Sequence, residues 1–482
     1  MASTFYWHDY ETWGIDPAVD RPCQFAGQRT DADLNPIGPP LVQYCRPADD
    51  CLPHPEACLV TGISPQHALR EGLPESDFAA AIQRELALPG TCGVGYNSLH
   101  FDDQVTRFLF YRNLLDPYAH TWQSGNSRWD LIEVLRLAHA LRPAGLVWPE
   151  REPGVTSFRL EDLSAANDIP HGQAHDALAD VTATIALARR LQQAQPRLFA
   201  YALGLRDQDR VRALLLEQHQ PLLHCSQRYP AVRGCIAPVA AVAVHPGQPK
   251  QVLCFDLRQD PAMLLDLDLA TLRQRLFTPA ADLPADQARI PLKGVRLNAA
   301  PMLAPMSTLS ASAAARWEID PAQVARHART WQGQAQAIAA KVQAIYHADD
   351  RPAPPASPDP ERQLYQGFFP DGDRRQMAHL RALSPAELAN AAPRFDDPRL
   401  PTLYFRWRAR NWPETLSEAE REDWDAWRLE RLTDPAAGAS LTLDPYAERI
   451  AALRQTHADA PAAQHLLDAL EAWAEQLMDA SG

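Results

Sequence analysis

The sequence predicts a protein of the α/β class, in which a mixed sheet with helices on its faces is followed by a smaller β-rich part and an all-helical part. Strand-like and helix-like segments alternate along residues 1–190, residues 196–346 become β-rich after an opening helix, and residues 361–482 contain amphipathic helices without convincing strands. Strands that come first and then alternate with helices favour a mixed sheet that is covered by helices.

The first part of the chain supplies the strands of the expected sheet. Residues 4–8 are an apolar, aromatic run, and residues 23–30, 41–46 and 91–96 are further strand candidates. Helices are expected at 77–88, 101–114, 129–141 and 174–194, the last of which is rich in Ala and Leu and ends before Pro196.

The rest of the chain divides at a proline-rich segment. Before it we expect a helix at 197–216, a hairpin of strands at 235–244 and 251–257, a strand at 290–297 and a helix at 321–346. Residues 347–360 contain five prolines and no apolar periodicity, which is typical of a linker. After it, the last two helices are expected at 444–457 and 461–479. The expected domains are therefore 1–194, 195–346 and 361–482, with 347–360 as the linker.

Composition bounds the class of protein. The 482 residues are 46% apolar and 22% charged, as in ordinary globular proteins, and carry a formal charge of −14. This charge argues against general adhesion to nucleic acids or anionic membranes, although it leaves room for a local basic groove. The eight cysteines show no CxxC spacing, and neither a signal peptide nor a membrane span is recognised. We therefore expect reduced thiols and a cytoplasmic location.

Three short segments of the first part carry acids. The first strand ends in HDYET, where Asp9 and Glu11 point to the same face because side chains alternate along a strand. The sequence GYNSLHFDD brings Asp102 to a strand-to-helix junction, and AHDALAD places His175 and Asp180 at the head of the long helix. Each segment alone is more often ordinary: a solvated strand end, an acid at a helix N-terminus or a capping histidine.

Together the three segments indicate a metal site. Four carboxylates do not converge unless cations neutralise them. Hard oxygen ligands without Cys or several His favour Mg²⁺ or Mn²⁺. Two such ions about 3.5–4 Å apart would activate a water and stabilise the leaving oxygen in phosphodiester hydrolysis. A nearby histidine, with an ordinary pKa of about 6.5, suits the removal of a proton from that water.

The motifs HDYET, GYNxxxFDD and AHDALAD resemble the DEDDh 3′-to-5′ exonuclease superfamily, which has a ribonuclease H-like fold. Five further segments, SRWDL, SFRLE, QPRLF, QLYQGFF and LYFRWRARNWPETL, are similar to the bacterial exonuclease I family, so that the resemblance covers essentially the whole chain. It implies an exonuclease domain, an SH3-like domain and a helical C-terminal domain. It also implies processive 3′-to-5′ degradation of single-stranded DNA to 5′-mononucleotides with two Mg²⁺ ions, in DNA repair and recombination.

The resemblance also implies roles for particular residues. Asp9, Glu11, Asp102 and Asp180 match the metal-binding acids, Glu11 also contacts the substrate, and His175 matches the general base. Arg159, in SFRLE, matches the residue that holds the phosphate of the terminal nucleotide, a task that suits the planar fork of an arginine.

A single strand would need cations and aromatic rings, on which bases stack with about 1–3 kcal/mol each. We expect such contacts from Tyr118 and Trp122, which lie in a polar loop, and from Arg107, Arg142 and Phe158. Further candidates are Arg112, Arg128, Phe110 and Tyr111, although helical spacing makes most such aromatic residues core. The segment FRWRAR (residues 405–410) fits a packing helix and a DNA contact about equally well.

Other functions are less well supported. The same acids would serve an enzyme of RNA ends or a proofreading domain, and a clamp that binds single strands without cutting them is a second alternative, which clustered acids would serve badly. The acidic tail of single-stranded DNA-binding protein is an expected partner. No residues are assigned to it, because Asn298-Ala299-Ala300-Pro301 and the helix from Pro321 depart from the family pattern. We expect a monomer.

Overall fold

The computed structural model describes residues 3–170, 172, 176–347 and 357–479. The chain forms two compact units, the first made of residues 1–127, 171–185 and 354–482 and the second of residues 128–170 and 186–353. The C-terminal helices therefore belong to the same unit as the N-terminal strands. Most of the expected proline-rich linker lies outside the described residues.

The first sheet has five strands in the order β3-β2-β1-β4-β5. Their bounds are Thr4–Thr12 for β1, Pro22–Thr30 for β2, Leu41–Tyr44 for β3, Thr91–Gly95 for β4 and Ser127–Asp130 for β5. β1 pairs with β2 in antiparallel and with β4 in parallel orientation, which confirms the mixed sheet. Trp129, expected in a helix, lies in β5 instead, because the helix begins only after Asp130, whose side chain accepts a hydrogen bond from Ile132 N.

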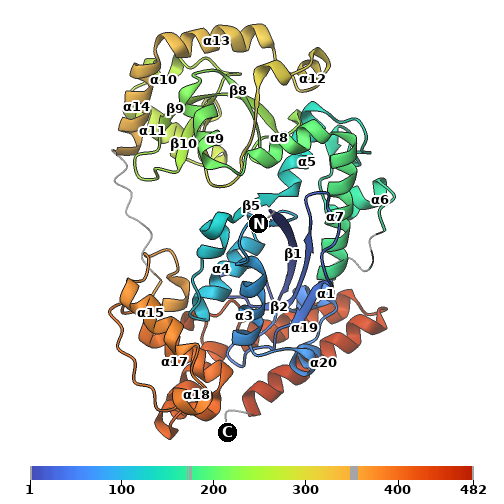
Figure 1. Ribbon diagram of the computed structural model, residues 1–482, viewed down its shortest axis with the longest axis vertical. Coiled ribbons are helices and arrows are strands. Elements are labelled where there is room, and N and C mark those ends of the chain that lie inside the picture. Colours follow the sequence, from blue (N-terminus) through green and yellow to red (C-terminus); the bar gives the residue numbers. More distant parts are fainter. Residues whose placement is uncertain (1–2, 171, 173–175, 348–356, 480–482) are drawn as a thin grey trace. The chain divides into compact units, whose positions relative to one another are not determined.

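Helices of the first unit cover this sheet (Figure 1). They are α1 (Pro55–Thr61), α2 (Pro65–Glu71), α3 (Glu75–Leu86), α4 (Asp102–Arg112) and the first half of α7 (Ala177–Ala194). Tyr6 and Tyr10 of β1 pack with Phe25 of β2 and Phe78 of α3 in one buried cluster that also includes apolar residues of α4. Burial of such aromatic side chains stabilises the strand that carries the acids.

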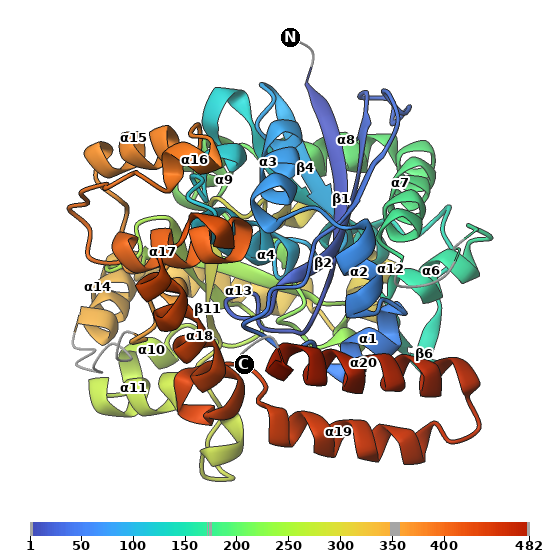
Figure 2. The same cartoon turned by 90° about the horizontal axis from the view of Figure 1, so that it is seen from below.

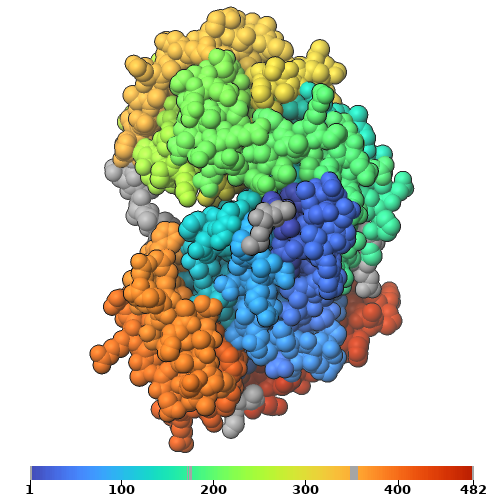
Figure 3. Space-filling view, in the orientation of Figure 1, coloured from blue at the N-terminus to red at the C-terminus, as the bar shows by residue number. Residues whose placement is uncertain are grey.

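The C-terminal helices pack against the outer side of this layer. Their bounds are Asp371–Leu380 for α15, Pro385–Leu388 for α16, Leu400–Asn411 for α17, Glu418–Thr433 for α18, Leu443–Thr456 for α19 and Pro461–Asp479 for α20. Phe108 and Tyr111 of α4 share a core with Met377 of α15 and Leu403 of α17. Figure 3 shows the orange segment that contains α15 and α17 directly beside the blue-to-cyan part of the first unit. Figure 2 shows α19 and α20 as a pair alongside α1, with Tyr446 donating to Leu470 O at 2.9 Å.

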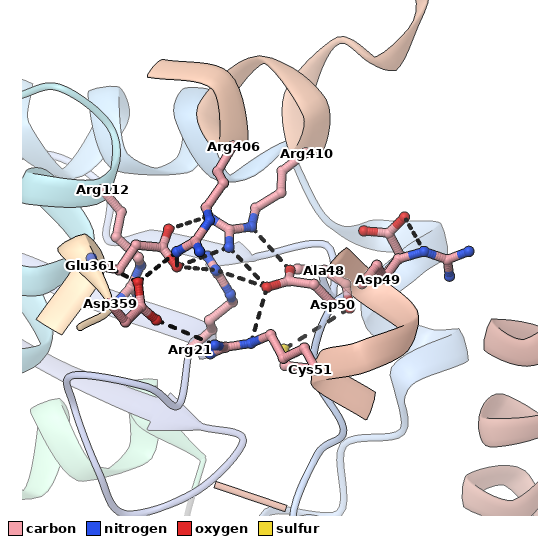
Figure 4. Close-up of polar contacts among 12 residues, drawn as sticks. Arg21, Ala48, Asp49, Asp50, Cys51, Arg112, Asp359, Glu361, Arg406 and Arg410 are labelled. Atoms are coloured by element: carbon pink, nitrogen blue, oxygen red, sulfur yellow. Dashed lines mark hydrogen bonds and ion pairs between the residues drawn. The ribbon is translucent and has the colours of Figure 1, made fainter. Parts of the chain in front are cut away.

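A buried ion-pair network lies where α17 meets the N-terminal strands (Figure 4). Arg410 is paired with both Asp50 and Glu361, and Arg21 donates to Glu75 at 2.7 Å. Arg406 donates to Asp359 at 2.6 Å, and Arg408 to Glu420 at 2.9 Å. All three arginines of FRWRAR are therefore used in packing, which decides between the two interpretations of that segment.

The second unit contains an antiparallel sheet in the order β11-β10-β9-β8-β12. The bounds are Leu222–Cys225 for β8, Ile236–Val244 for β9, Gln251–Asp256 for β10, Leu292–Arg296 for β11 and Met302–Pro305 for β12. The expected hairpin is confirmed as β9 and β10. β8 and β12 were not expected, because each is only four residues long and lacks a clear alternation of apolar and polar residues.

The helices of the second unit are shorter than expected. They are α5 (Leu131–Leu141), α6 (Leu160–Ala166), the second half of α7, α8 (Pro196–Gly204), α9 (Gln208–Arg212), α10 (Met263–Asp266), α11 (Leu269–Phe277), α12 (Ala311–Arg316), α13 (Pro321–Gly333) and α14 (Ala335–His347), with a small hairpin of β6 (Glu150–Glu152) and β7 (Val155–Thr156). The expected helix at 321–346 breaks at Gln334, next to Gly333, and the expected helix at 197–216 breaks after Gly204. None of the described helices is both long and apolar enough to cross a membrane.

Candidate active site

The end of β1 and the first turn of α7 bring three acids together. Asp9, Glu11 and Asp180 each offer a carboxylate oxygen, and the three oxygens lie within 4.8 Å of one another. Asp9 and Glu11 share one face of β1, as their spacing predicts. Asp180, about 170 residues away in sequence, completes a group of oxygen donors with the spacing that a divalent cation requires.

Asp102 lies beside this group at the start of α4. Its Oδ1 accepts a hydrogen bond from Tyr10 N at 3.2 Å, between the two acids of β1, and its side chain is buried. The close packing of the end of β4 against β1 and Ser98 needs a glycine at position 95. A Cβ on Gly95 would lie 2.6 Å from Ser98 Cβ and 3.0 Å from His8 O. The parallel pairing of β1 with β4 therefore positions the fourth acid.

The acids of this group resist ionisation together. Burial, followed by the charges of Asp102, Glu11 and Asp180, raises the pKa of Asp9 well above its usual value. Burial and the charge of Asp180 raise the pKa of Glu11 to about 9, and burial raises the pKa of Asp102 to about 7. Carboxylates in this state bind a divalent cation readily, because the cation removes the repulsion that otherwise keeps them protonated. The donor set thus fits Mg²⁺ or Mn²⁺.

The start of α7 is fixed by Asp176, which the sequence interpretation passed over. Its Oδ1 accepts hydrogen bonds from Leu178 N at 3.1 Å and Ala179 N at 3.0 Å, as a helix cap does. Ala177 N donates to Gln24 Oε1 of β2 at 3.3 Å. These contacts hold the turn that carries Asp180 against the sheet. His175, the expected general base, lies outside the described residues.

An aromatic surface lies on the first unit, around the expected DNA contacts Arg107 and Tyr118. The Arg107 guanidinium lies 5.6 Å from the centre of the Tyr118 ring, and Phe368 packs edge-to-face on the same ring at 5.5 Å. Phe368 is 79% exposed, Tyr365 56% and Trp122 64%. Tyr365 donates to the Gln104 side chain on α4, less than one helical turn after Asp102.

Tyr365 and Phe368 were not expected as contacts. They belong to the segment QLYQGFF, which has three aromatic residues in seven positions without a helical period. The position of aromatic residues in a segment without a periodic apolar face is the sequence signal that distinguishes them from core residues. That signal had already favoured Tyr118 and Trp122.

The remaining expected contacts lie in the second unit. Phe158 packs edge-to-face on His139 at 5.4 Å, Arg159 is exposed directly before α6, and Arg142 donates to Thr308 O at 2.9 Å. Arg128 donates to Asn298 O at 3.0 Å.

The expectation that most aromatic residues at helical spacing are core is confirmed for Phe110 and Tyr111 of α4. Arg112, a weaker candidate for a strand contact, is wrong, because it is 3% exposed and paired with Glu75. All three side chains face the interior because the helix presents them to α3 and to the C-terminal helices.

Three family models match the chain. They are described as an exonuclease, over residues 6–188, an exonuclease I SH3-like domain, over residues 206–348, and an exonuclease I C-terminal domain, over residues 358–477. Between them they span nearly the whole sequence.

Named relatives agree. Exodeoxyribonuclease I of Escherichia coli is 44% identical over 99% of this chain and 98% of its own length, and that of Haemophilus influenzae is 40% identical over 92% and 94%. The crystal structure of E. coli exonuclease I in complex with a dA16 oligonucleotide superposes with a TM-score of 0.93 at 44% identity, over 98% of this chain and 100% of that one. Exonuclease I from Methylocaldum szegediense also gives 0.93, at 45% identity, over 99% and 100%. The expected ribonuclease H-like, SH3-like and helical parts are thereby confirmed, and the chain belongs to the exonuclease I family.

Proposed function

We propose that the protein degrades single-stranded DNA processively from its 3′ end and releases 5′-mononucleotides. The observation that carries this proposal is the convergence of Asp9, Glu11 and Asp180 within 4.8 Å, with Asp102 bonded to the same strand. Solved structures of the E. coli relative with dA16 and dT13 oligonucleotides support single-stranded DNA as the substrate class.

We infer that Asp9, Glu11, Asp102 and Asp180 hold two Mg²⁺ ions, for which Mn²⁺ can substitute. Bound there, the ions would supply Lewis-acid stabilisation of the phosphate and a water of lowered pKa. A zinc-bound form of the E. coli relative complexed with single-stranded DNA supports a divalent cation in the family.

The chain's own residues then have separate tasks. His175, one residue before the cap of α7, accepts the proton of the attacking water, and Arg159 grips the terminal phosphate with two donors. Tyr118, Trp122 and Phe158 hold bases by stacking. Tyr365 and Phe368 extend the aromatic surface of the first unit around Tyr118. Glu11 also contacts the terminal nucleotide. Arg107 and Arg142 contact the backbone of the strand.

The direction and product are tested with labelled oligonucleotides. With Mg²⁺, a 3′-labelled strand should release labelled mononucleotide at once, whereas a 5′-labelled strand should shorten stepwise. Addition of unlabelled competitor after the start should leave running chains unaffected if cleavage is processive. Release of the 5′ label first, or faster cleavage of RNA than of DNA, would contradict the proposal.

We also propose the acidic tail of single-stranded DNA-binding protein as a partner, a monomeric state, a cytoplasmic location and a role in DNA repair and recombination. These proposals rest on family resemblance. Binding of a fluorescent acidic tail peptide and light scattering of the purified protein test the first two. A peptide that does not bind, or a stable dimer, would contradict them.

A further inference from the structure

A strongly basic pocket lies in the second unit, at one end of β10 and β11. Its volume is about 710 Å³. Six basic side chains line it: Arg228, Arg233, Arg258, Arg275, Arg289 and Lys293. We call this the arginine pocket. In a chain with a formal charge of −14, such a concentration of positive charge is the opposite of the average surface.

Acids do not neutralise the arginine pocket. Asp256 is the one acid among its described lining residues, and it is paired with Arg258 at 2.9 Å. Arg233 is paired with Glu318 at 3.4 Å, in an exposed pair. Five of the six cations therefore have no carboxylate partner among the described residues that line the pocket.

The cations are held in place by other contacts. Arg275 Nε donates to Ala288 O at 2.7 Å, and Arg289 donates to Leu276 O at 2.5 Å. The Lys293 ammonium lies 3.9 Å from the centre of the Tyr229 ring and donates to Arg228 O. Backbone acceptors and a ring position these groups without cancelling their charge, which leaves the pocket preorganised for an anion.

The guanidinium of Arg258 is fixed in the wall of the pocket. Its nitrogens bond Asp256 and Ile236 O, and Nη1 is buried without a hydrogen bond within the described residues.

Burial lowers the pKa of Lys293, and so do the neighbouring cations, because acids in the pocket do not balance their charge. Burial, together with Arg228, Arg258 and Arg289, lowers the pKa of the Lys293 ammonium to about 8, against the opposing effect of Asp256. The other groups that face it are Tyr229, whose pKa is raised well above its usual value by burial, and His224, whose pKa is lowered to about 3 by burial and by Lys293 and Arg228. Near neutral pH, His224 is therefore uncharged and Lys293 is the titrating cation.

We propose that the arginine pocket binds small molecules that carry two or more phosphates, with nucleoside polyphosphates as the ligand class. Adjacent phosphates bring several negative charges into a few ångströms, which suits several cations around one pocket, and a guanidinium with free donors can bond phosphate oxygens in a bidentate manner. The volume suits a nucleotide, for which Met263 and Leu292 offer apolar contact. A DNA strand carries one charge per nucleotide and would engage an extended row of cations better than a pocket.

The test uses pyrophosphate and ATP as probes, with the full-length protein in EDTA, by isothermal titration calorimetry. We expect both to bind, and Arg258→Ala and Arg289→Ala each to weaken binding about tenfold or more, the usual effect of losing a hydrogen bond to a charged group. Arg326→Ala, which removes an exposed cation from α13 outside the pocket, is the matched control and should change nothing. The absence of binding, or equal binding by all three variants, would overturn the proposal.

Lys293 supplies a second readout. An anion favours the charged ammonium, so affinity should be full below the pKa of about 8 and should fall as the pH rises through it. Lys293→Arg should bind ATP with this pH dependence removed, since arginine stays charged. Unchanged pH dependence in that variant would contradict the role of Lys293.

Two further experiments distinguish ligand binding in the arginine pocket from the proposed nuclease activity. Asp9→Asn should bind ATP like the wild type even where it cuts no DNA, so failure of one proposal leaves the other intact. A dT oligonucleotide is the competing ligand. If the arginine pocket variants lose affinity for the oligonucleotide and none of the proteins binds ATP or pyrophosphate, the pocket holds a strand and the proposal is wrong.

Discussion

At the scale of single residues, the unusual feature is a buried group of acids that repel one another. Asp9 and Glu11 have pKa values far above those of ordinary carboxyls, because they are buried and face Asp102 and Asp180. In the absence of a cation, the folded protein keeps protons that the unfolded chain releases. The site thus lowers the stability of the metal-free protein at neutral pH. A bound metal ion would remove the repulsion between the acids and restore this stability.

The pH dependence of stability follows with a definite sign. Since the folded pKa values are raised, the stabilising contribution is present below the ordinary carboxyl pKa and is lost as the pH rises from there towards about 9, the value for Glu11. In EDTA, the melting temperature should fall across this range. Glu11→Gln should flatten the slope, whereas Glu448→Gln, at an exposed position of α19, should not. Equal slopes in the wild type and Glu11→Gln would contradict the assignment.

Replacing one acid should separate stability from activity. Asp9→Asn removes a repelling carboxylate, so the metal-free variant should melt at a higher temperature than the metal-free wild type while DNA cleavage falls by at least about a thousandfold. Calorimetry in EDTA and a cleavage assay with Mg²⁺ measure the two effects. A variant that is less stable but active would show that Asp9 is structural.

At the scale of elements, the capping of α7 decides where Asp180 lies. Asp176→Ala should cost about 1 kcal/mol of stability and reduce cleavage, because the cap is lost. Asp176→Asn is the control, because it retains a capping oxygen without the charge and should keep most of the stability. If both variants lose the same stability, the charge of Asp176 matters more than the cap.

Many of the individual strands and helices could be predicted from the sequence. Strand β1 followed from a continuous apolar, aromatic run, and the alternation of side chains along a strand placed its two acids on one face. The hairpin β9–β10 followed from two runs on either side of a proline-glycine turn. Short strands such as β8 and β5 escaped, since four residues carry too little periodicity. Asp176 escaped because a cap is recognised only once the helix start is known, and the motif drew attention to His175 and Asp180.

At the scale of the whole molecule, the C-terminal helices belong to the unit that carries the acids. No local pattern predicts this, because it depends on pairings such as Arg410 with Asp50, separated by about 360 residues. Arginine in a helix is typical both of a solvated face and of a buried pair, and FRWRAR left the choice open. Tertiary structure resolves it: the side chains of Arg406, Arg408 and Arg410 are at most 9% exposed.

The buried network makes a prediction for the whole unit. Removing one partner leaves an uncompensated buried charge, so Glu361→Ala should cost about 3–5 kcal/mol. Asp371→Ala breaks an exposed pair with Arg374 and should cost much less, because solvent screens an exposed ion pair. Chemical denaturation measures both. Equal small losses would show that the network contributes little to joining the C-terminal helices to the sheet.

The central claim is that acids far apart in the sequence gather around divalent cations, and anomalous diffraction from crystals soaked in Mn²⁺ tests it most directly. We predict two peaks within coordinating distance of Asp9, Glu11, Asp102 and Asp180, and a loss of occupancy in the Asp180→Asn variant. Mn²⁺ density elsewhere, with none among these four carboxylates, would contradict the account.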